Sequence, residues 1–171
     1  MNSVQRGHRK AMTFILAVQN APEVVARAFL LGKQALRGNH AAQVACMDER
    51  RWTGSINIDQ ALMGEADHAQ ACRWDYGLGY LDPTGTERAV WVEVHSAETS
   101  EVSKIICKLT WLKDYLSQHC TDLWELTQKG DQATRFVWLA SGRCNIPSHM
   151  PQLRRLRTAG LQPPARRLEL P

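Results

Sequence analysis

The sequence lacks several features that would assign the chain to a specialised class. Its five cysteines include no CxxC pair, so zinc-knuckle spacing is excluded, and an odd number does not suit a disulfide framework. We therefore expect free, mostly buried thiols in a reducing compartment. The longest apolar run near the start, residues 12–18, is too short to span a bilayer and lacks a clear signal-peptide cleavage site. These absences predict a cytoplasmic protein with no membrane partner.

Internal repeats, low-complexity tracts and linker-like stretches are also absent. A chain of 171 residues is long enough for one domain with a substantial core. Its 44% content of hydrophobic residues is that of an ordinary globular protein. The sequence therefore predicts a single domain over residues 1–171, with residues 1–8 as a polar end.

Acidic residues are missing from residues 135–167, although the net charge of the whole chain is only +4. Such a stretch suits an anionic partner such as DNA or RNA. We take four of its arginines as candidate nucleic-acid-binding residues: Arg143, Arg154, Arg155 and Arg157. The alternative is a solvated, arginine-rich surface with no partner. The seven arginines of this stretch are Arg135, Arg143, Arg154, Arg155, Arg157, Arg166 and Arg167.

Hydrophobic patterns in the second half predict strands and helices in alternation. Residues 73–80 and 88–96 predict an antiparallel hairpin, because the connector DPTGTE has proline and glycine at favoured turn positions. Residues 99–118 carry one apolar stripe at helical spacing, and residues 134–140 predict a further strand. The basic C-terminal part, residues 149–171, predicts a short helix that ends at Gly160 and a last edge strand over 166–170.

The first half gives weaker patterns. Residues 9–19 suit either a helix or a strand, and a helix is predicted from Pro22 to about Gly38. Residues 44–47 suit a short strand or a helical turn, and residues 58–63 a short helix capped by Asn57. Taken together, the elements predict an α/β fold with a mixed central sheet of four to six strands flanked by helices.

Two carboxylates and an imidazole fall on the predicted hairpin. Glu93 and His95 project to the same face of their strand because they are two residues apart, and Asp75 lies on the neighbouring strand. Such a set is a plausible divalent-metal site. Glu65, just upstream, would supply another ligand or else belong to an exposed acidic turn.

Structural roles are the alternative for each of these three residues. Asp75 would pair with Arg73 or Arg88, and His95 would be a structural histidine. Glu93 lies in the middle of AVWVEVH, so if it is buried it must be paired or functional.

The order of Asp75, an apolar strand with Glu93-Val94-His95, an amphipathic helix and a further strand resembles the PD-(D/E)xK nuclease superfamily. The resemblance covers about residues 56–140 and implies a restriction-endonuclease-like fold. It also implies that Asp75 and Glu93 bind Mg²⁺ (or Mn²⁺) and that the metal activates a water to attack a phosphodiester. Glu65 would stand for the additional acid that many members place on the upstream helix.

The chain departs from the family pattern at two places. Trp74 rather than proline precedes Asp75, and His95 stands where the family has a lysine. Histidine serves as a general base near neutral pH but does not supply the permanent charge of lysine. Because some members carry the lysine on the following helix, Lys104 and Lys108 are the candidates to replace it.

The leading hypothesis from the sequence is a metal-dependent, nuclease-like protein that hydrolyses phosphodiester bonds in nucleic acid. The second is a catalytically inactive member of the same fold that binds nucleic acid or protein, since the motif lysine is missing. A third takes the arginines as a solubilising surface and the protein as a structural partner of another chain.

Overall fold

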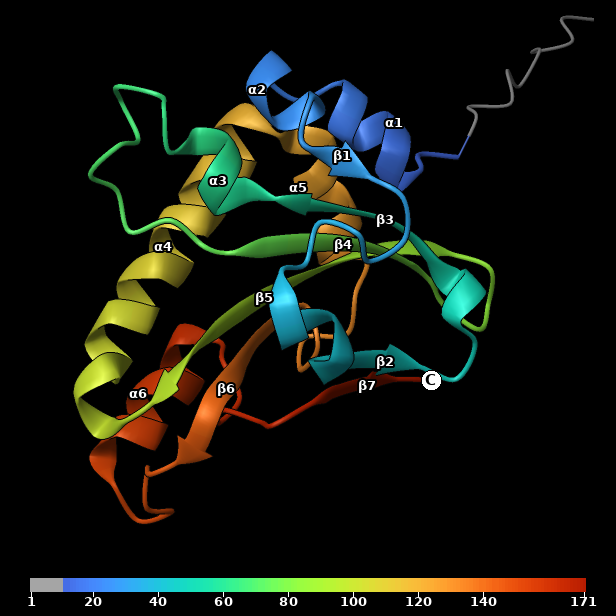
Figure 1. Cartoon of the computed structure of the whole chain (residues 1–171). Coiled ribbons are helices and arrows are strands. Elements are labelled where there is room, and N and C mark those ends of the chain that lie inside the picture. The colour runs from blue at the N-terminus through green and yellow to red at the C-terminus, as the bar shows by residue number, and fades with distance from the viewer. Residues whose placement is uncertain (1–10) are drawn as a thin grey trace, which may run out of the picture.

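The hairpin with the candidate acids forms the centre of a five-stranded mixed sheet (Figure 1). The computed structural model describes residues 11–171, so the predicted polar end at residues 1–8 lies outside the described residues. In spatial order β1 (Phe29–Leu30), β3 (Trp52–Asn57), β4 (Tyr76–Leu81) and β5 (Glu87–Ala97) are paired antiparallel, whereas β6 (Phe136–Cys144) runs parallel to β5. An α/β fold with a mixed sheet flanked by helices is thus confirmed.

The β4–β5 hairpin forms as the sequence predicts. Gly85 N donates to Asp82 O at 2.9 Å and closes the turn, and Gly85 has a φ of 80°, which favours glycine. The strands pair from Leu81 with Glu87 to Tyr76 with Val92. This register directs alternate side chains of β5 to opposite faces of the sheet.

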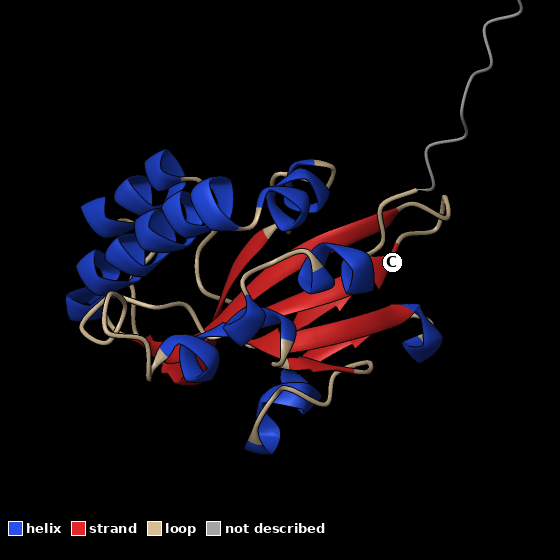
Figure 2. Cartoon of the chain, turned by 90° about the horizontal axis from the view of Figure 1, so that it is seen from above, coloured by secondary structure: helices blue, strands red, loops and turns tan. Residues whose placement is uncertain are grey.

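Each face of the sheet has its own cover (Figures 1 and 2). Helices pack on the face that carries Trp91, where they form the larger core. The opposite face, with Val90 and Val92, packs against a separate two-stranded parallel sheet, β2 (Val44–Cys46) with β7 (Leu168–Leu170). The helices on the first face are α1 (Phe14–Gln19), α2 (Glu23–Ala26), α3 (Ile58–Leu62), α4 (Val102–His119), α5 (Thr121–Gln128) and α6 (Pro151–Ala159).

Several local predictions are confirmed. Asn57 caps α3 through its side-chain oxygen, which accepts from Gln60 N at 2.9 Å. Helix α6 ends at Gly160, whose φ of 90° lies in the left-handed region that favours glycine. Residues 14–19 are helical and residues 44–46 form a strand, which decides the two open alternatives. Within residues 11–171 no helix is long and apolar enough to cross a membrane.

The predicted helix from Pro22 to about Gly38 is wrong. Helix α2 ends after a single turn, and Phe29 then enters β1, where it pairs with Ile56 of β3. The ring of Phe29 occupies the space that a side chain at Gly54 would fill. Gly32, with a φ of 54°, follows in a conformation that no α-helix accepts. Tertiary packing of Phe29 therefore overrides a helical spacing of apolar residues.

Three further features of the fold bear on the sequence predictions. The predicted last edge strand forms as β7, and it pairs with β2 in the small two-stranded sheet. Helix α5, between α4 and β6, is not among the elements that the sequence predicts. The five cysteines are free, as expected, yet only Cys120 is buried, while Cys107 and Cys144 are exposed.

Close packing at Gly77 fixes the strand that follows Asp75. A Cβ on Gly77 would lie 2.6 Å from the ring of Trp91, the register partner of Gly77. Trp91 is fully buried, and its Nε1 donates to Thr127 Oγ1 at 2.8 Å. The indole is therefore held from both sides and has no room to yield.

We expect Gly77→Ala to lower the free energy of unfolding by about 1–3 kcal/mol, because the added methyl overpacks this contact. Gly64→Ala is the matched control: a Cβ at Gly64 meets open space, so the change should stay within about 0.5 kcal/mol. Urea unfolding of both variants measures the difference. Equal stabilities for the two would contradict the packing described here.

Candidate active site

Asp75 and Glu93 lie side by side on the helix-covered face of the sheet. Asp75 immediately precedes β4, and because Tyr76 pairs with Val92, Asp75 comes opposite Glu93. Asp75 N donates to Glu93 Oε2 at 3.1 Å, and Val94 N donates to Asp75 Oδ2 at 2.9 Å. Each carboxylate is thus held by the backbone of the other strand.

Lys108 brings a cation to both carboxylates. Its Nζ donates to Glu93 Oε1 and lies 3.6 Å from Asp75 Oδ1. The side chain of Glu93 is fully buried, and that of Lys108 is 14% exposed. Helix α4 places Lys108 there because its neighbour Leu109 and Leu112, one turn on, are buried against the sheet. Of the two lysines predicted on the helix, Lys108 reaches the acids.

Burial and the negative charge of Asp75 determine the protonation state of Glu93. Burial, followed by the negative charge of Asp75, raises the pKa of Glu93 to about 8, although Lys108 acts in the opposite direction. Burial opposes the charged form of Lys108 too, but Glu93 and Asp75 outweigh it and raise its pKa. A second cation at the carboxylates would favour release of the proton from Glu93.

His95 is held at the border of the site by Glu101. His95 Nε2 lies 2.6 Å from Glu101 Oε2, while His95 Nδ1 is 4.0 Å from Glu93 Oε1. The hydrogen bond with His95 lowers the pKa of Glu101. Glu101 is not among the site residues that the sequence predicts. Its position six residues after His95, across the strand-to-helix connection, is the signal that would have linked the two.

Two predicted residues do not join the acids. Lys104 Nζ lies 3.9 Å from Glu101 Oε2, and its side chain is 56% exposed. Glu65 is exposed in the turns after α3, and no contact within residues 11–171 connects it to Asp75 or Glu93. The physical reason is that α3 ends at Leu62, so Glu65 is not on a helix that faces the sheet.

The structural alternative for Asp75 is not borne out. Arg73 Nε donates to Asp59 Oδ1 at 2.9 Å, and Arg88 Nε donates to Asp82 Oδ2 at 2.9 Å. Both arginines therefore have carboxylate partners other than Asp75.

The donor set fits a hard divalent cation held by two carboxylates. Across the described part of the chain, no group of three or more His, Cys, Asp and Glu side chains could hold a metal ion. Mg²⁺ is commonly bound by one or two carboxylates, with water and substrate oxygens as further ligands. The Lys108 ammonium already occupies the space between Asp75 and Glu93, so the two carboxylates converge on a position where a cation is stable.

Of the candidate arginines, Arg155 contacts the N-terminal end of α4. Helix α6 packs against α4, and Arg155 Nη2 donates to Ser103 Oγ at 3.1 Å. Arg143 lies near the end of β6 and is exposed. Ion pairs with carboxylates hold other arginines of residues 11–171 but none of the four candidates, Arg143, Arg154, Arg155 and Arg157.

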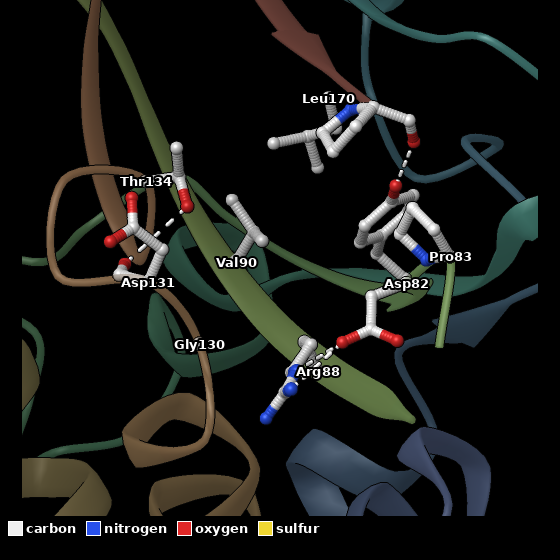
Figure 3. A pocket seen from close by; sticks show the side chains of 10 residues that line it. Asp82, Pro83, Arg88, Val90, Gly130, Asp131, Thr134 and Leu170 are labelled. Carbon is white, nitrogen blue, oxygen red and sulfur yellow. Dashed lines mark hydrogen bonds and ion pairs between the residues drawn. The ribbon is translucent and has the colours of Figure 1, made fainter. Parts of the chain in front are cut away.

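A separate pocket of about 290 Å³ lies at the turn end of the hairpin (Figure 3). Asp82 and Arg88 form its rim and Val90 part of its wall, while Tyr80 Oη donates to the carbonyl of Pro171. Burial favours the protonated form of Asp82, but hydrogen bonds from Thr84, Thr86 and Arg88 outweigh it and lower its pKa to about 2. No predicted site residue lines this pocket.

Comparison of the chain with models of protein families, with curated proteins and with solved structures found no match.

Proposed function

We propose that the chain is a metal-dependent, nuclease-like phosphodiesterase with a restriction-endonuclease-like fold. The observation that carries the proposal is the contact of one partly buried lysine, Lys108, with two carboxylates that adjacent strands bring together, Asp75 and Glu93. A cation, two acids and a lysine are the parts that the resemblance to the PD-(D/E)xK superfamily implies.

The order of elements supports this proposal. A helical segment precedes the antiparallel strands β3, β4 and β5, and helix α4 then leads by way of α5 to β6, parallel to β5. Asp75 comes at the start of the middle strand and Glu93 in the next one. This arrangement is similar to the one expected for the superfamily, with Lys108 on the helix in place of the motif lysine.

Each residue of the site has a role in the proposed reaction. Asp75 and Glu93 would hold Mg²⁺ or Mn²⁺, and the bound metal would supply Lewis-acid activation of a water and of the phosphodiester. Lys108 would orient the water and neutralise charge on the phosphate. His95, fixed by Glu101, would accept a proton at the border of the site. The arginines of α6 would contact the polynucleotide backbone.

The same contact also favours a second function, that of an inactive binding module. Lys108, Glu93 and Asp75 satisfy one another as a partly buried polar network, which a protein can retain for structural reasons alone. Such a module would bind a polynucleotide or protein partner without hydrolysing it.

Calorimetric titration of Mn²⁺ and Mg²⁺, with plasmid cleavage followed in parallel, separates the two functions. We expect Asp75→Asn to weaken Mn²⁺ binding by at least about tenfold and to reduce cleavage with it, because a charged ligand is removed. Asparagine keeps an acceptor for Val94 N, so the fold should persist.

Glu65→Gln is the control, since it also removes one acid but lies outside the site. It should bind metal and cleave as the unsubstituted protein does. Metal binding and cleavage both absent from the unsubstituted protein would leave the binding module as the function. Equal losses in Asp75→Asn and Glu65→Gln would remove Asp75 from the site.

A further inference from the structure

A second basic site lies where β6 ends. An open cavity of about 500 Å³ is bounded by three segments that are far apart in the sequence. The end of the 3₁₀ helix Gly38–Gln43 supplies Gln43, β6 supplies residues 140–143, and the segment before β7 supplies Arg166. Its two charged side chains, Arg143 and Arg166, have the same sign.

Gln43 fixes the backbone on both sides of this cavity. Its Nε2 donates to Ala140 O at 2.9 Å and to Arg166 O at 3.1 Å. Ala165, next to Arg166, is tied to β6 as well, because Ala140 N donates to Ala165 O at 2.8 Å. The backbone at Arg166 is therefore held by a hydrogen bond from Gln43 and, through its neighbour Ala165, by one from β6.

The charge of the cavity is not neutralised by the protein. No Asp or Glu lines it, and within residues 11–171 neither Arg143 nor Arg166 forms an ion pair with a carboxylate. The adjacent Arg167 differs, since its Nε lies 3.4 Å from Glu169 Oε1. Two guanidinium groups without carboxylate partners suit a phosphate, which arginine binds with paired N–H donors.

The cavity lies at the β6 edge of the sheet, and two of its residues, Gln43 and Arg166, come from the segments before β2 and β7, which cover the face opposite Asp75 and Glu93. Ala140, which lines it, is the register partner of His95, and Trp138, two residues earlier, is that of Glu93. Neighbouring strands are about 4.8 Å apart. The β6 backbone that lines the cavity is thus one strand away from His95, so a polynucleotide that passes round this edge of the sheet would span the two positions within a few nucleotides.

We propose that this cavity binds a backbone phosphate of the polynucleotide at a position away from the cleaved bond. Arg143 and Arg166 contact the phosphate, and Gln43 is the positioning residue that holds both sides of the site. The inference rests on the proposed function, because it takes the substrate to be a polynucleotide. It adds a second phosphate-binding position that sets where the strand lies relative to Asp75 and Glu93.

The salt dependence of binding tests the assignment. Fluorescence anisotropy with labelled single-stranded and duplex DNA and RNA oligonucleotides, in EDTA, measures affinity without cleavage. For Arg143→Gln/Arg166→Gln we expect the slope of log affinity against log salt to shrink by roughly 0.7–0.9 for each phosphate that the protein no longer neutralises. Affinity at low salt should fall by at least about tenfold. Gln43→Leu should weaken binding while leaving the charge unchanged.

Arg27→Gln/Arg50→Gln is the matched control. It removes the same charge from two exposed arginines that pair with Glu23 and Asp48. Its salt slope should stay that of the unsubstituted protein. An unchanged slope in Arg143→Gln/Arg166→Gln, or an equal loss in the control, would overturn the proposal while the proposed function stands.

Two further arms separate the sources of phosphate and the two proposals. Inorganic phosphate that competes at the affinity of an oligonucleotide would overturn a polynucleotide site and indicate a free anion. An unsubstituted protein that binds no polynucleotide at low salt would overturn this inference and the proposed function together. Loss of cleavage in Asp75→Asn with an unchanged salt slope would support both the proposed function and the second phosphate-binding position.

Discussion

The free energy of unfolding is expected to fall by several kcal/mol as the pH rises from about 5 to about 8, because Glu93 must give up a proton inside the protein. Glutamate in an unfolded chain titrates near about pH 4.3. Burial and Asp75 raise the pKa of Glu93 in the folded protein to about 8. A carboxyl with a raised folded pKa contributes stability that is complete below the unfolded pKa and is lost as the pH rises through the folded pKa.

The size of the fall in the free energy of unfolding follows from the width of this pH range. Each unit of pKa difference corresponds to about 1.4 kcal/mol, so three pH units amount to roughly 4 kcal/mol. Urea unfolding of the unsubstituted protein and of Glu93→Gln across this range measures it. Glutamine keeps an acceptor for Asp75 N but does not titrate, so its curve should lack the fall.

Asp82→Asn is the control for this measurement. Hydrogen bonds hold the pKa of Asp82 at about 2, so the residue stays charged throughout the window. Its curve should run parallel to that of the unsubstituted protein. If Glu93→Gln showed the same fall as the unsubstituted protein, Glu93 would not be the titrating group.

Lys108 is expected to matter far more for cleavage than His95. Lys108 touches both acids, whereas His95 is directed to Glu101 and lies 4.0 Å from Glu93. We expect Lys108→Arg, which keeps the charge but not the compact ammonium geometry, to slow cleavage by at least about 10²-fold. His95→Gln should cost less than about tenfold, because it removes a residue at the border of the site.

Single-turnover cleavage at saturating Mg²⁺ and Mn²⁺ compares these variants on the chemical step. Lys104→Arg is the matched control for Lys108→Arg, since Lys104 is on the same helix but is exposed and does not reach the acids. A larger loss in His95→Gln than in Lys108→Arg would reverse the two roles. His95 would then be the residue that replaces the motif lysine.

The sequence predicts what depends on local order along the chain. The DPTGTE turn and the alternating residues of its strands predict the hairpin, and the hairpin brings Asp75 opposite Glu93. The apolar stripe of α4 in turn restricts its lysines to particular faces. These parts of the fold and site follow from spacing within one or two adjacent elements.

The remainder depends on contacts between distant segments. Whether Lys104 or Lys108 reaches the acids depends on how α4 is placed along the sheet, and the sequence does not encode that distance locally. Phe29 leaves a helical pattern because a glycine on β3 offers room for its ring. Glu101 joins the site only because the chain reverses after β5. In each case long-range packing decides between local options of similar quality.

The pairing of β2 with β7 has a consequence for the order of folding. Val44 and Leu168 are far apart in the sequence, so their contact closes a very large loop and is slow to form. Until then, one face of the central sheet lacks its cover, and Tyr76, Leu78, Val90 and Val92 are open to solvent. During synthesis this face stays exposed until residues 168–170 have been made, and exposed apolar surface of this kind favours aggregation at that stage.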